Sequence, residues 1–174
     1  NATRGTHLVN VAAVHIEPMG VYAGKTASLE ELADGATIAV PSDATNEGRA
    51  LLLLETQGLI KLADSTNLSS TPNDIVENPK NLEFVEMEAA QIPSSLADVD
   101  LAVINSNYAL GAGLNPTEDA LVLESADSPY VNVLVVKEGN EEAPAVLALI
   151  EALHSDTIRT YIEETYGGAV IPAF

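Results

Sequence analysis

The sequence predicts an α/β fold, on the basis of its segment pattern and its composition. Short apolar runs rich in β-branched residues alternate with segments that carry helical start and stop signals. Strands that alternate with helices are typical of largely parallel sheets covered by helices. Hydrophobic residues make up 47% of the 174 residues and aromatic residues only 4%, so we expect an aliphatic core in one domain or in two small lobes.

The apolar runs predict the strands. Each run is short and ends at proline, glycine or polar turn residues. Residues 82–87 alternate apolar and acidic side chains, which indicates a half-exposed strand, whereas residues 128–137 are apolar around Asn132 and indicate a buried one. The predicted strands cover residues 8–14, 21–22, 36–40, 82–87, 100–104, 120–123 and 128–137.

Capping residues and glycine stops delimit the predicted helices. Ser28 and Ser155 are start signals, Gly58 is a left-handed stop, and Pro93 interrupts one helical segment. The predicted helices cover residues 28–32, 49–57, 71–76, 90–97, 108–112, 142–154 and 155–166.

Residues 36–59 are the segment around which the chain is organised. They indicate a buried strand, a polar loop and a helix whose N-cap is Thr45 or Asn46. This helix is apolar on all sides, so we expect it to be buried. Its first turn nevertheless carries Arg49, where the positive end of the helix dipole disfavours a cation. Two partners for Arg49 stay open: a bound anion, or an acid of the protein such as Glu47.

Two asparagines extend this candidate site. Asn105 follows the predicted strand 100–104, and the loop before Arg49 follows another strand, so both can face the crevice beyond the carboxyl ends of parallel strands. Asn132, inside an apolar run, needs hydrogen-bond partners. An arginine and two amides suit a carboxylate and an ammonium group rather than a phosphate. The alternatives are a strand-end cap for Asn105 and a backbone bridge for Asn132.

Charge and missing motifs argue against several classes of protein. Seven basic residues face 26 acidic ones, a formal net charge of -19, which repels nucleic acid and anionic lipid. Cysteine is absent, which removes disulfides and cysteine-ligated zinc. No nucleophile elbow, HExxH motif, phosphate loop or metal-ligand cluster appears, so we expect no enzyme, cofactor or metal. No apolar run is long enough to span a bilayer, and no signal peptide is visible.

Several long segments resemble one protein family. In chain order they are VHIEPMGVYAGK, LEELADGATIAVPSDATNEGRALLLLETQGLIKLAD, VENPKNLEFVEMEAAQIPSSL, DLAVINSNYA and ESADSPYVNVLVV, and they cover nearly the whole chain. The sequence is similar to the methionine-binding lipoproteins of ABC importers, the NlpA/MetQ-type family.

That resemblance implies a two-lobed, periplasmic-binding-protein-like (type II) α/β fold. Residues 1–34 and 125–174 would form a partial lobe one, and residues 35–124 would form lobe two. Family members carry a further N-terminal segment, with the first strands of lobe one and aromatic residues of the pocket, which nothing in this sequence matches. We therefore expect the first lobe to be incomplete at its N-terminus.

The resemblance also implies a function. Proteins of this family are extracytoplasmic solute receptors that deliver methionine, or a close amino-acid relative, to an ABC transporter permease. A lipidated N-terminal cysteine, absent from this chain, anchors them to the cell membrane, and this anchor is the only membrane contact that we expect. Closure of the lobes would bury the ligand.

The predicted site residues come from the matching segments. Arg49 resembles the family's carboxylate clamp, and Asn105 and Asn132 resemble ligands of the amino acid's backbone groups. His15 falls where family members place a ring against the ligand side chain, although a histidine in a loop more often has a local partner. The other predicted ligand contacts are Glu17, Asn46 and Tyr108.

Two other functions stay open from the sequence. One is an enzyme on a related two-lobed fold, such as a dehydratase, which the lack of catalytic motifs disfavours. The other is the effector-sensing domain of a cytoplasmic regulator, which would need a DNA-binding segment upstream.

Overall fold

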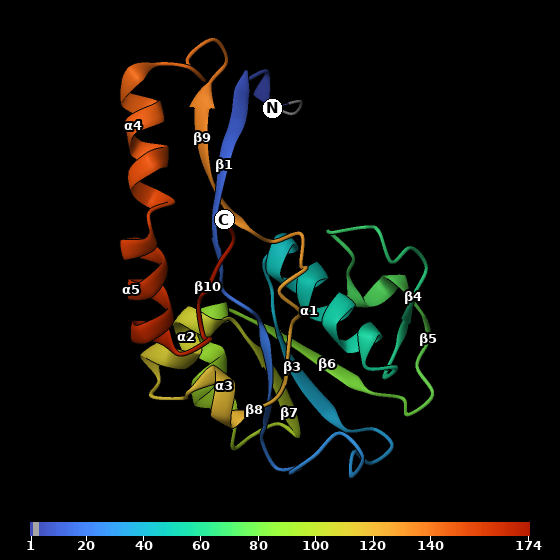
Figure 1. Cartoon of the computed structure of the whole chain (residues 1–174). Coiled ribbons are helices and arrows are strands. Elements are labelled where there is room, and N and C mark those ends of the chain that lie inside the picture. The colour runs from blue at the N-terminus through green and yellow to red at the C-terminus, as the bar shows by residue number, and fades with distance from the viewer. Residues whose placement is uncertain (2–3) are drawn as a thin grey trace. The chain divides into compact units, whose positions relative to one another are not determined.

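The computed structural model describes residues 1 and 4–174, which divide into two units (Figure 1). Unit 1 comprises Asn1–Pro18 and Ser125–Phe174, and unit 2 comprises Met19–Glu124. The sequence predicts that residues 19–34 belong to the first lobe. In the structure, strand β2 (Gly20–Ala23) pairs with two strands of the unit 2 sheet, so these residues lie in unit 2 instead.

Unit 2 is built on a five-stranded sheet with the strand order β6-β3-β7-β2-β8. Strand β3 pairs in parallel with β6 and β7, but β2 is antiparallel to both β7 and β8. The expected largely parallel sheet is therefore a mixed one, because β2 enters it against the direction of its neighbours. The other strands are β3 (Thr37–Pro41), β6 (Glu83–Met87), β7 (Leu101–Ile104) and β8 (Ala120–Leu123).

Both faces of this sheet are covered by helices, which explains why its central strands are apolar runs. Ile38 and Val40 belong to the core shared with α1 (Ala44–Thr56), whereas Ala39 between them belongs to a second core on the opposite face. The second core also holds residues of η3 (Ala89–Ser95), a 3-10 helix, and of α2 (Ser106–Gly111). Helix α3 (Pro116–Asp119) leads into β8.

Some short segments differ from the prediction. Residues 28–32 form turns rather than a helix, although Glu31 N–H donates to the Ser28 hydroxyl over 3.4 Å as a capping pair would. The helix expected over residues 71–76 is the short 3-10 helix η2 (Pro72–Asp74). It ends early because β5 (Ile75–Glu77) pairs with β4 (Lys61–Leu62), a strand that the sequence did not indicate.

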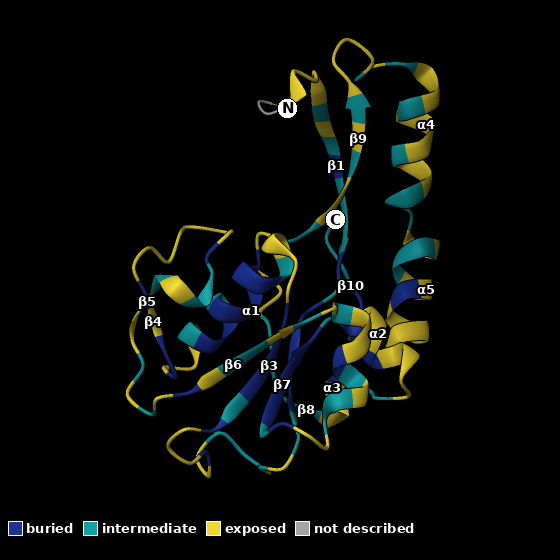
Figure 2. Ribbon diagram, turned by 180° about the vertical axis from the view of Figure 1, so that it is seen from behind, coloured by how far each residue is buried: buried dark blue, intermediate teal, exposed yellow. Residues whose placement is uncertain are grey.

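Unit 1 contains a three-stranded antiparallel sheet, β10-β1-β9, and two helices. Its elements are β1 (Leu8–Ile16), β9 (Asn132–Lys137), α4 (Pro144–Leu153), α5 (Asp156–Tyr166) and β10 (Ile171–Pro172). Figure 2 shows few buried positions in this unit. Helix α4 has no buried residue, and Val135 and Leu147 are 44% and 51% exposed. Among the described residues, no helix has the length and apolar character needed to cross a membrane.

Candidate functional site

One edge of the unit 2 sheet brings several predicted polar residues together. Strands β3 and β7 are parallel, so their carboxyl ends, which lead into α1 and Asn105, lie at the same edge. Strand β2 runs the other way, with its first residue opposite the last residues of β7 and β8, so Met19 and Glu124 also lie at this edge. Crevices beyond the carboxyl ends of strands are the usual ligand sites of such sheets.

Helix α1 starts earlier than expected because Asp43 is its N-cap. The Asp43 carboxylate accepts a hydrogen bond from Asn46 N–H over 3.1 Å and another from Asn46 Nδ2 over 2.9 Å. The predicted caps, Thr45 and Asn46, are thus wrong, and Arg49 lies in the second helical turn, where the dipole opposes a cation less. Gly58, at φ +71°, follows the last turn as predicted.

Arg49 is buried and forms an ion pair with Glu124, the residue that follows β8. Arg49 Nε donates to Glu124 Oε1 over 3.1 Å and to Oε2 over 3.0 Å, and Nη2 also donates to Oε2. The side chains are only 10% and 11% exposed. Of the two kinds of partner that the sequence left open, the structure shows a protein acid, but this acid is Glu124 and not Glu47.

Asn46 and Asn105 join α1 to the end of β7. Asn105 Nδ2 donates to Asn46 Oδ1 over 2.8 Å. Asn105 is the N-cap residue of α2, but its side chain makes no capping bond, so the strand-end cap is not its role. Its Oδ1 atom is buried and has no hydrogen-bond partner among the described residues. This carbonyl oxygen is therefore an acceptor that a ligand N–H can use.

Glu47 is a second buried acid at the start of α1, and it is 4% exposed. Burial, the neighbouring Glu86 carboxyl and the charge of Asp43 raise the pKa of Glu47 to about 7. At neutral pH this carboxyl therefore carries a proton for part of the time.

Three predicted contacts lie in unit 1. His15 Nε2 and Glu17 Oε1 are 3.1 Å apart, and both side chains are about one third exposed, at 28% and 34%. Asn132 is paired with His15 across β1 and β9. The expectation that Asn132 lies in a buried strand is wrong, since β9 is the outer strand of its sheet and Asn132 is exposed.

Tyr108 lines a depression between α2 and η3 in unit 2, with a volume of about 520 Å³. The lining residues are Ala90, Pro93, Ser94, Asn107, Tyr108, Gly111 and Ala112. No other predicted contact belongs to this lining, so the structure does not bring Tyr108 together with Asn46, Arg49 or Asn105 there.

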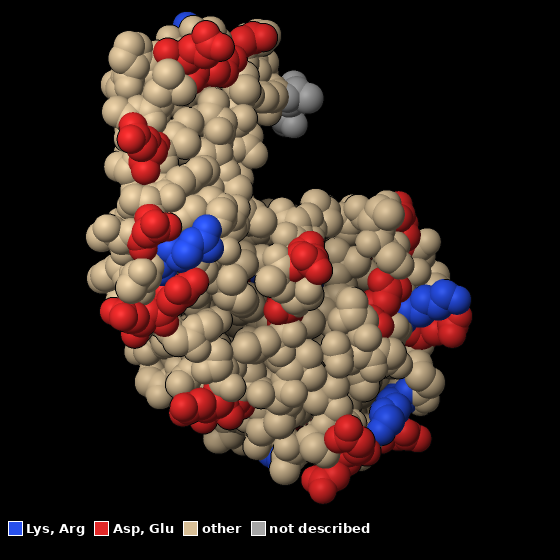
Figure 3. Space-filling model, in the orientation of Figure 1, with Lys and Arg blue, Asp and Glu red and all other residues tan. Residues whose placement is uncertain are grey.

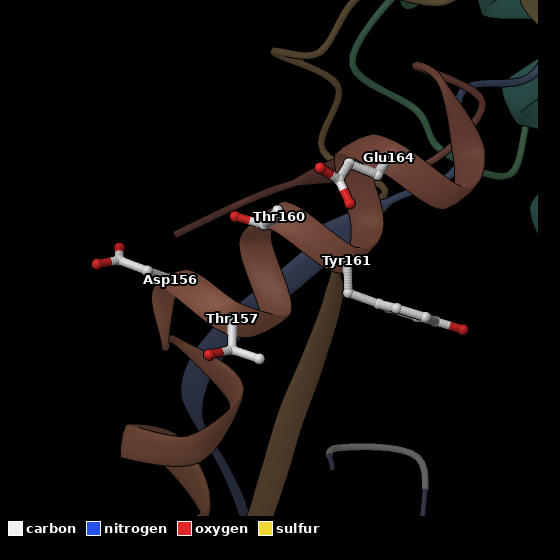
Figure 4. A pocket seen from close by; sticks show the side chains of 5 residues that line it. All are labelled: Asp156, Thr157, Thr160, Tyr161 and Glu164. Atoms are coloured by element: carbon white, nitrogen blue, oxygen red, sulfur yellow. The ribbon is translucent and has the colours of Figure 1, made fainter.

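Another depression lies along α5 and is lined by Asp156, Thr157, Thr160, Tyr161 and Glu164. Figure 4 shows that these side chains spread in different directions from one helix, so they do not converge on a common point. Among residues 1 and 4–174, no group of three or more histidine or acidic side chains is placed to hold a metal ion. Acidic side chains are scattered over the face drawn in Figure 3 with uncharged surface between them.

A model of the NlpA lipoprotein family matches residues 1–174. The chain belongs to the NlpA lipoprotein family. This family membership confirms the resemblance on which the site prediction depends. Individual relatives of the NlpA family match nearly the whole of this chain. The match covers a smaller part of each relative's own length.

The D-methionine-binding lipoprotein MetQ of Salmonella typhi is 46% identical over 170 residues, which are 97% of this chain and 63% of MetQ. MetQ of Escherichia coli K12 is 45% identical over the same shares of the two chains. Outer membrane lipoprotein 2 of Mannheimia haemolytica is 40% identical over 97% of this chain and 61% of its own length. This NlpA-family chain therefore spans less than two thirds of these curated relatives.

Solved structures of similar proteins agree in fold. A nutrient-binding protein of Burkholderia cenocepacia bound to methionine has a TM-score of 0.89 at 45% identity, over 99% of this chain and 73% of that one. The methionine-binding protein MetQ has a TM-score of 0.84 at 44% identity, over 99% and 71%. These similarities confirm the predicted two-lobed α/β fold class for this NlpA-family chain.

Glu124 is the residue of this site that sequence reasoning missed. Its signal was present, because Glu124 directly follows the predicted strand 120–123 as Asn105 follows the strand 100–104. Applying the strand-end argument to every strand would have included it.

Proposed function

We propose that this chain is the ligand-binding part of an extracytoplasmic receptor that takes up methionine, or a close amino-acid relative, as a zwitterion. The observation that carries this proposal is that a buried guanidinium and a buried amide oxygen, which has no partner among the described residues, belong to elements that meet at one sheet edge of unit 2. These two groups have the chemistry to bind the carboxylate and the ammonium of one amino acid.

Arg49 supports the carboxylate half of the proposal. A guanidinium presents five N–H donors in a plane and binds carboxylates through two parallel hydrogen bonds. Because Arg49 is 8% exposed, such contacts form in a poorly solvated environment where they are stronger than at the surface. The N–H groups of the α1 start lie at the same edge and favour an anion.

Asn105 supports the ammonium half. Its Oδ1 atom is buried without a partner among the described residues, and its orientation is fixed by the bond from Nδ2 to Asn46. An ammonium donates up to three hydrogen bonds and accepts none, so it suits this oxygen. Asn46 then acts by orienting Asn105.

The remaining predicted contacts stay predictions. His15, Glu17 and Asn132 lie in unit 1, and Tyr108 lines the α2–η3 depression. The identity of the ligand is supported by relatives, since the S. typhi protein is named for D-methionine and the B. cenocepacia structure contains methionine.

The proposed receptor passes its ligand to an ABC transporter permease and carries out no reaction on it. The lipoprotein names of the relatives support a location outside the cytoplasm, with attachment to the cell membrane through a lipid anchor. A Coxiella burnetii structure at 47% identity is named as the periplasmic substrate-binding protein of an ABC transporter, which supports the same role.

Calorimetry on the purified chain tests the ligand. Titration with L-methionine and D-methionine should show saturable binding of at least one isomer, and the methyl ester, which lacks the carboxylate charge, should bind at least about tenfold more weakly. Absence of binding by both isomers, or equal binding of ester and amino acid, would contradict the proposal.

A further inference from the structure

The first turn of α1 contains a buried carboxyl group, that of Glu47. This residue is 4% exposed, and its Oε1 atom is buried without a hydrogen-bond partner among the described residues. An ionised carboxylate can accept hydrogen bonds at both oxygens, so a desolvated oxygen without a donor disfavours the charged form. A protonated carboxyl avoids this cost. The surroundings of Glu47 therefore favour a proton on its side chain.

Glu86 of β6 supplies a second carboxyl group beside Glu47. In the parallel pair of β3 and β6, Glu86 lies opposite Val40, which belongs to the core shared with α1, so Glu86 is on the α1 side of the sheet. Burial, a side-chain hydrogen bond with Glu86, and the negative charges of Glu86 and Asp43 raise the pKa of Glu47 to about 7. A hydrogen bond between two carboxyl groups requires that one of them holds a proton.

We propose that Glu47 and Glu86 form a proton-sharing clamp that fixes the start of α1 to β6, and that loss of the proton above neutral pH loosens this helix start and weakens ligand binding. The effect on the ligand rests on the proposed function. The clamp itself is a property of the chain without ligand, so the two parts can be tested separately.

The first turn of α1 connects the clamp to the proposed ammonium site. Glu47 N–H donates to Asp43 O over 2.8 Å, and the Asp43 carboxylate accepts the Asn46 N–H bond over 3.1 Å. Asn46 Oδ1 in turn accepts the bond from Asn105 Nδ2 over 2.8 Å. A displacement of Glu47 is therefore passed through one helical turn to the side chain that orients Asn105.

The charged groups that act on Glu47 are acids. Asp43 belongs to its own helix, and Glu86 belongs to β6. Strand β3, which also packs against α1, has the sequence TIAVP and so carries no titratable side chain. The segment 63–70 contacts α1 through its backbone, and its one titratable residue, Asp64, is an acid as well. Loss of the shared proton therefore brings like charges together, which drives the two carboxyl groups apart.

Carbon NMR of the glutamate carboxyl groups tests the clamp without ligand, with the Glu47 signal assigned by its absence from Glu47→Gln. In wild type this signal should titrate with a midpoint near pH 7 rather than near 4.5. Glu86→Gln should move the midpoint down toward 4.5, because a glutamine amide carries no charge and donates to the ionised carboxylate. Glu83→Gln, at an exposed position of the same strand, is the matched control and should leave the midpoint unchanged. A wild-type midpoint near 4.5, or an equal change in both variants, would overturn the clamp.

Amide hydrogen exchange measures the loosening of the helix start. The Glu47 N–H group, which is bonded to Asp43 O, should lose protection by about three- to tenfold between pH 6 and pH 8 in wild type, after correction for the intrinsic exchange rate. In Glu47→Gln the protection of the same amide should stay constant over this range. Constant protection in wild type would show that the proton does not hold the start of α1.

Calorimetry with methionine tests the effect of the clamp on the ligand site. The titration of methionine itself affects both proteins equally, so the ratio of the dissociation constants of wild type and Glu47→Gln isolates the clamp. This ratio should rise by about three- to tenfold between pH 6 and pH 8. Glu86→Gln serves as the reference if Glu47→Gln does not fold, because its Glu47 is already ionised at pH 6.

The two kinds of measurement separate this inference from the proposed function. A ratio that stays constant with pH, while Glu47 titrates near pH 7, would overturn the coupling between the clamp and the ligand site. If neither protein binds methionine, the proposed function and the coupling fail together. The carboxyl titration and the amide exchange still decide whether the clamp exists.

Discussion

Asn105 Nδ2 donates a hydrogen bond to Asn46 Oδ1 over 2.8 Å, and this bond determines which way the Asn105 amide faces. Because the amide nitrogen is committed to Asn46, the amide oxygen is directed elsewhere and stays buried without a partner among the described residues. An acceptor left in this state costs about 1–3 kcal/mol, which a ligand N–H would recover. The pair therefore links the start of α1 to the proposed ammonium site.

The first prediction concerns Asn105→Ala. This variant should weaken methionine binding by about ten- to a hundredfold, because it removes a hydrogen bond to a charged group. Its melting temperature without ligand should stay near that of wild type, since loss of the bond to Asn46 is offset by removal of the unpartnered oxygen. Asn107→Ala, at an exposed position on the same helix, is the control. Unchanged affinity in Asn105→Ala would exclude this residue from the site.

The second prediction concerns Arg49→Ala. Loss of a charge-assisted contact should cost about 1.5–3 kcal/mol of binding free energy. The variant should also lower the free energy of unfolding by about 3–5 kcal/mol, because Glu124 is left buried without its cation. Denaturant unfolding and calorimetry measure the two effects.

A double variant separates binding from stability at this pair. Arg49→Met combined with Glu124→Gln removes both charges and keeps an acceptor for Met19 N–H. It should unfold at a denaturant concentration near that of wild type and still fail to bind methionine. Restored binding in the double variant would show that Arg49 has a structural role alone.

The third prediction concerns Asn132→Ala in unit 1. Asn132 is exposed at the start of β9, so its replacement should change the free energy of unfolding by no more than about 0.5 kcal/mol. If Asn132 contacts the ligand, methionine should then raise the melting temperature of the variant less than that of wild type. An equal shift in both proteins would leave Asn132 outside the site.

The fourth prediction concerns pH and Glu47. Its pKa is raised from 4.5 to about 7 in the folded protein, so the folded state binds the proton more tightly than the unfolded state. The stabilisation from this group is complete below pH 4.5 and is lost as the pH rises through about 7. Glu47→Gln, which resembles the protonated form, should therefore exceed wild type in stability at pH 8 by about 1–3 kcal/mol and match it at pH 4.

Denaturant unfolding of both proteins between pH 4 and pH 8 checks the Glu47 prediction. Glu83→Gln makes the same charge change at an exposed position of β6, the strand that carries Glu86. A stability difference that does not depend on pH, or one that is equally large in Glu83→Gln, would show that Glu47 is not the group responsible.

The fifth prediction concerns Gly48 in α1. A Cβ at this position would lie 2.5 Å from Leu68 O and 3.0 Å from Ser70 N, which are backbone atoms that have little room to move. Gly48→Ala should therefore destabilise the protein by about 1–3 kcal/mol, although alanine favours helices. At Gly111 of α2 a Cβ meets nothing within 4 Å, so Gly111→Ala should be neutral or stabilising. Thermal unfolding of the two variants shows whether steric crowding at Gly48 outweighs the higher helix propensity of alanine.

Local sequence signals predicted the elements whose burial and caps depend on near neighbours. Strand β8 has the predicted bounds, and α5 starts after Ser155, whose hydroxyl accepts from Ile158 N–H over 3.4 Å. The predicted position of Asn105 after β7 is also confirmed. In each case the signal that predicts the element lies within the same helical turn or the same strand as the residues concerned.

Predictions from the sequence failed where a feature depends on a partner far away in the sequence, or on which of several neighbouring residues takes the same role. Glu124 is 75 residues from Arg49, and no periodicity connects the two. The burial of Asn132 depends on whether another strand covers β9, which its apolar neighbours do not reveal. The sequence predicts Thr45 or Asn46 as the N-cap of α1, whereas the structure has Asp43, an equally suitable residue two positions earlier than Thr45.

The sparse core of unit 1 has a consequence for how the molecule fluctuates. Its buried apolar side chains among the described residues are few (Ala12, Ile16, Pro18, Ile162, Ala169 and Val170), whereas β3 and β7 of unit 2 are covered on both faces. Local opening is easiest where little apolar contact is lost. In deuterated solvent, the amides of α4 should therefore take up deuterium long before those of β3 and β7, which would remain the last protected part of the chain.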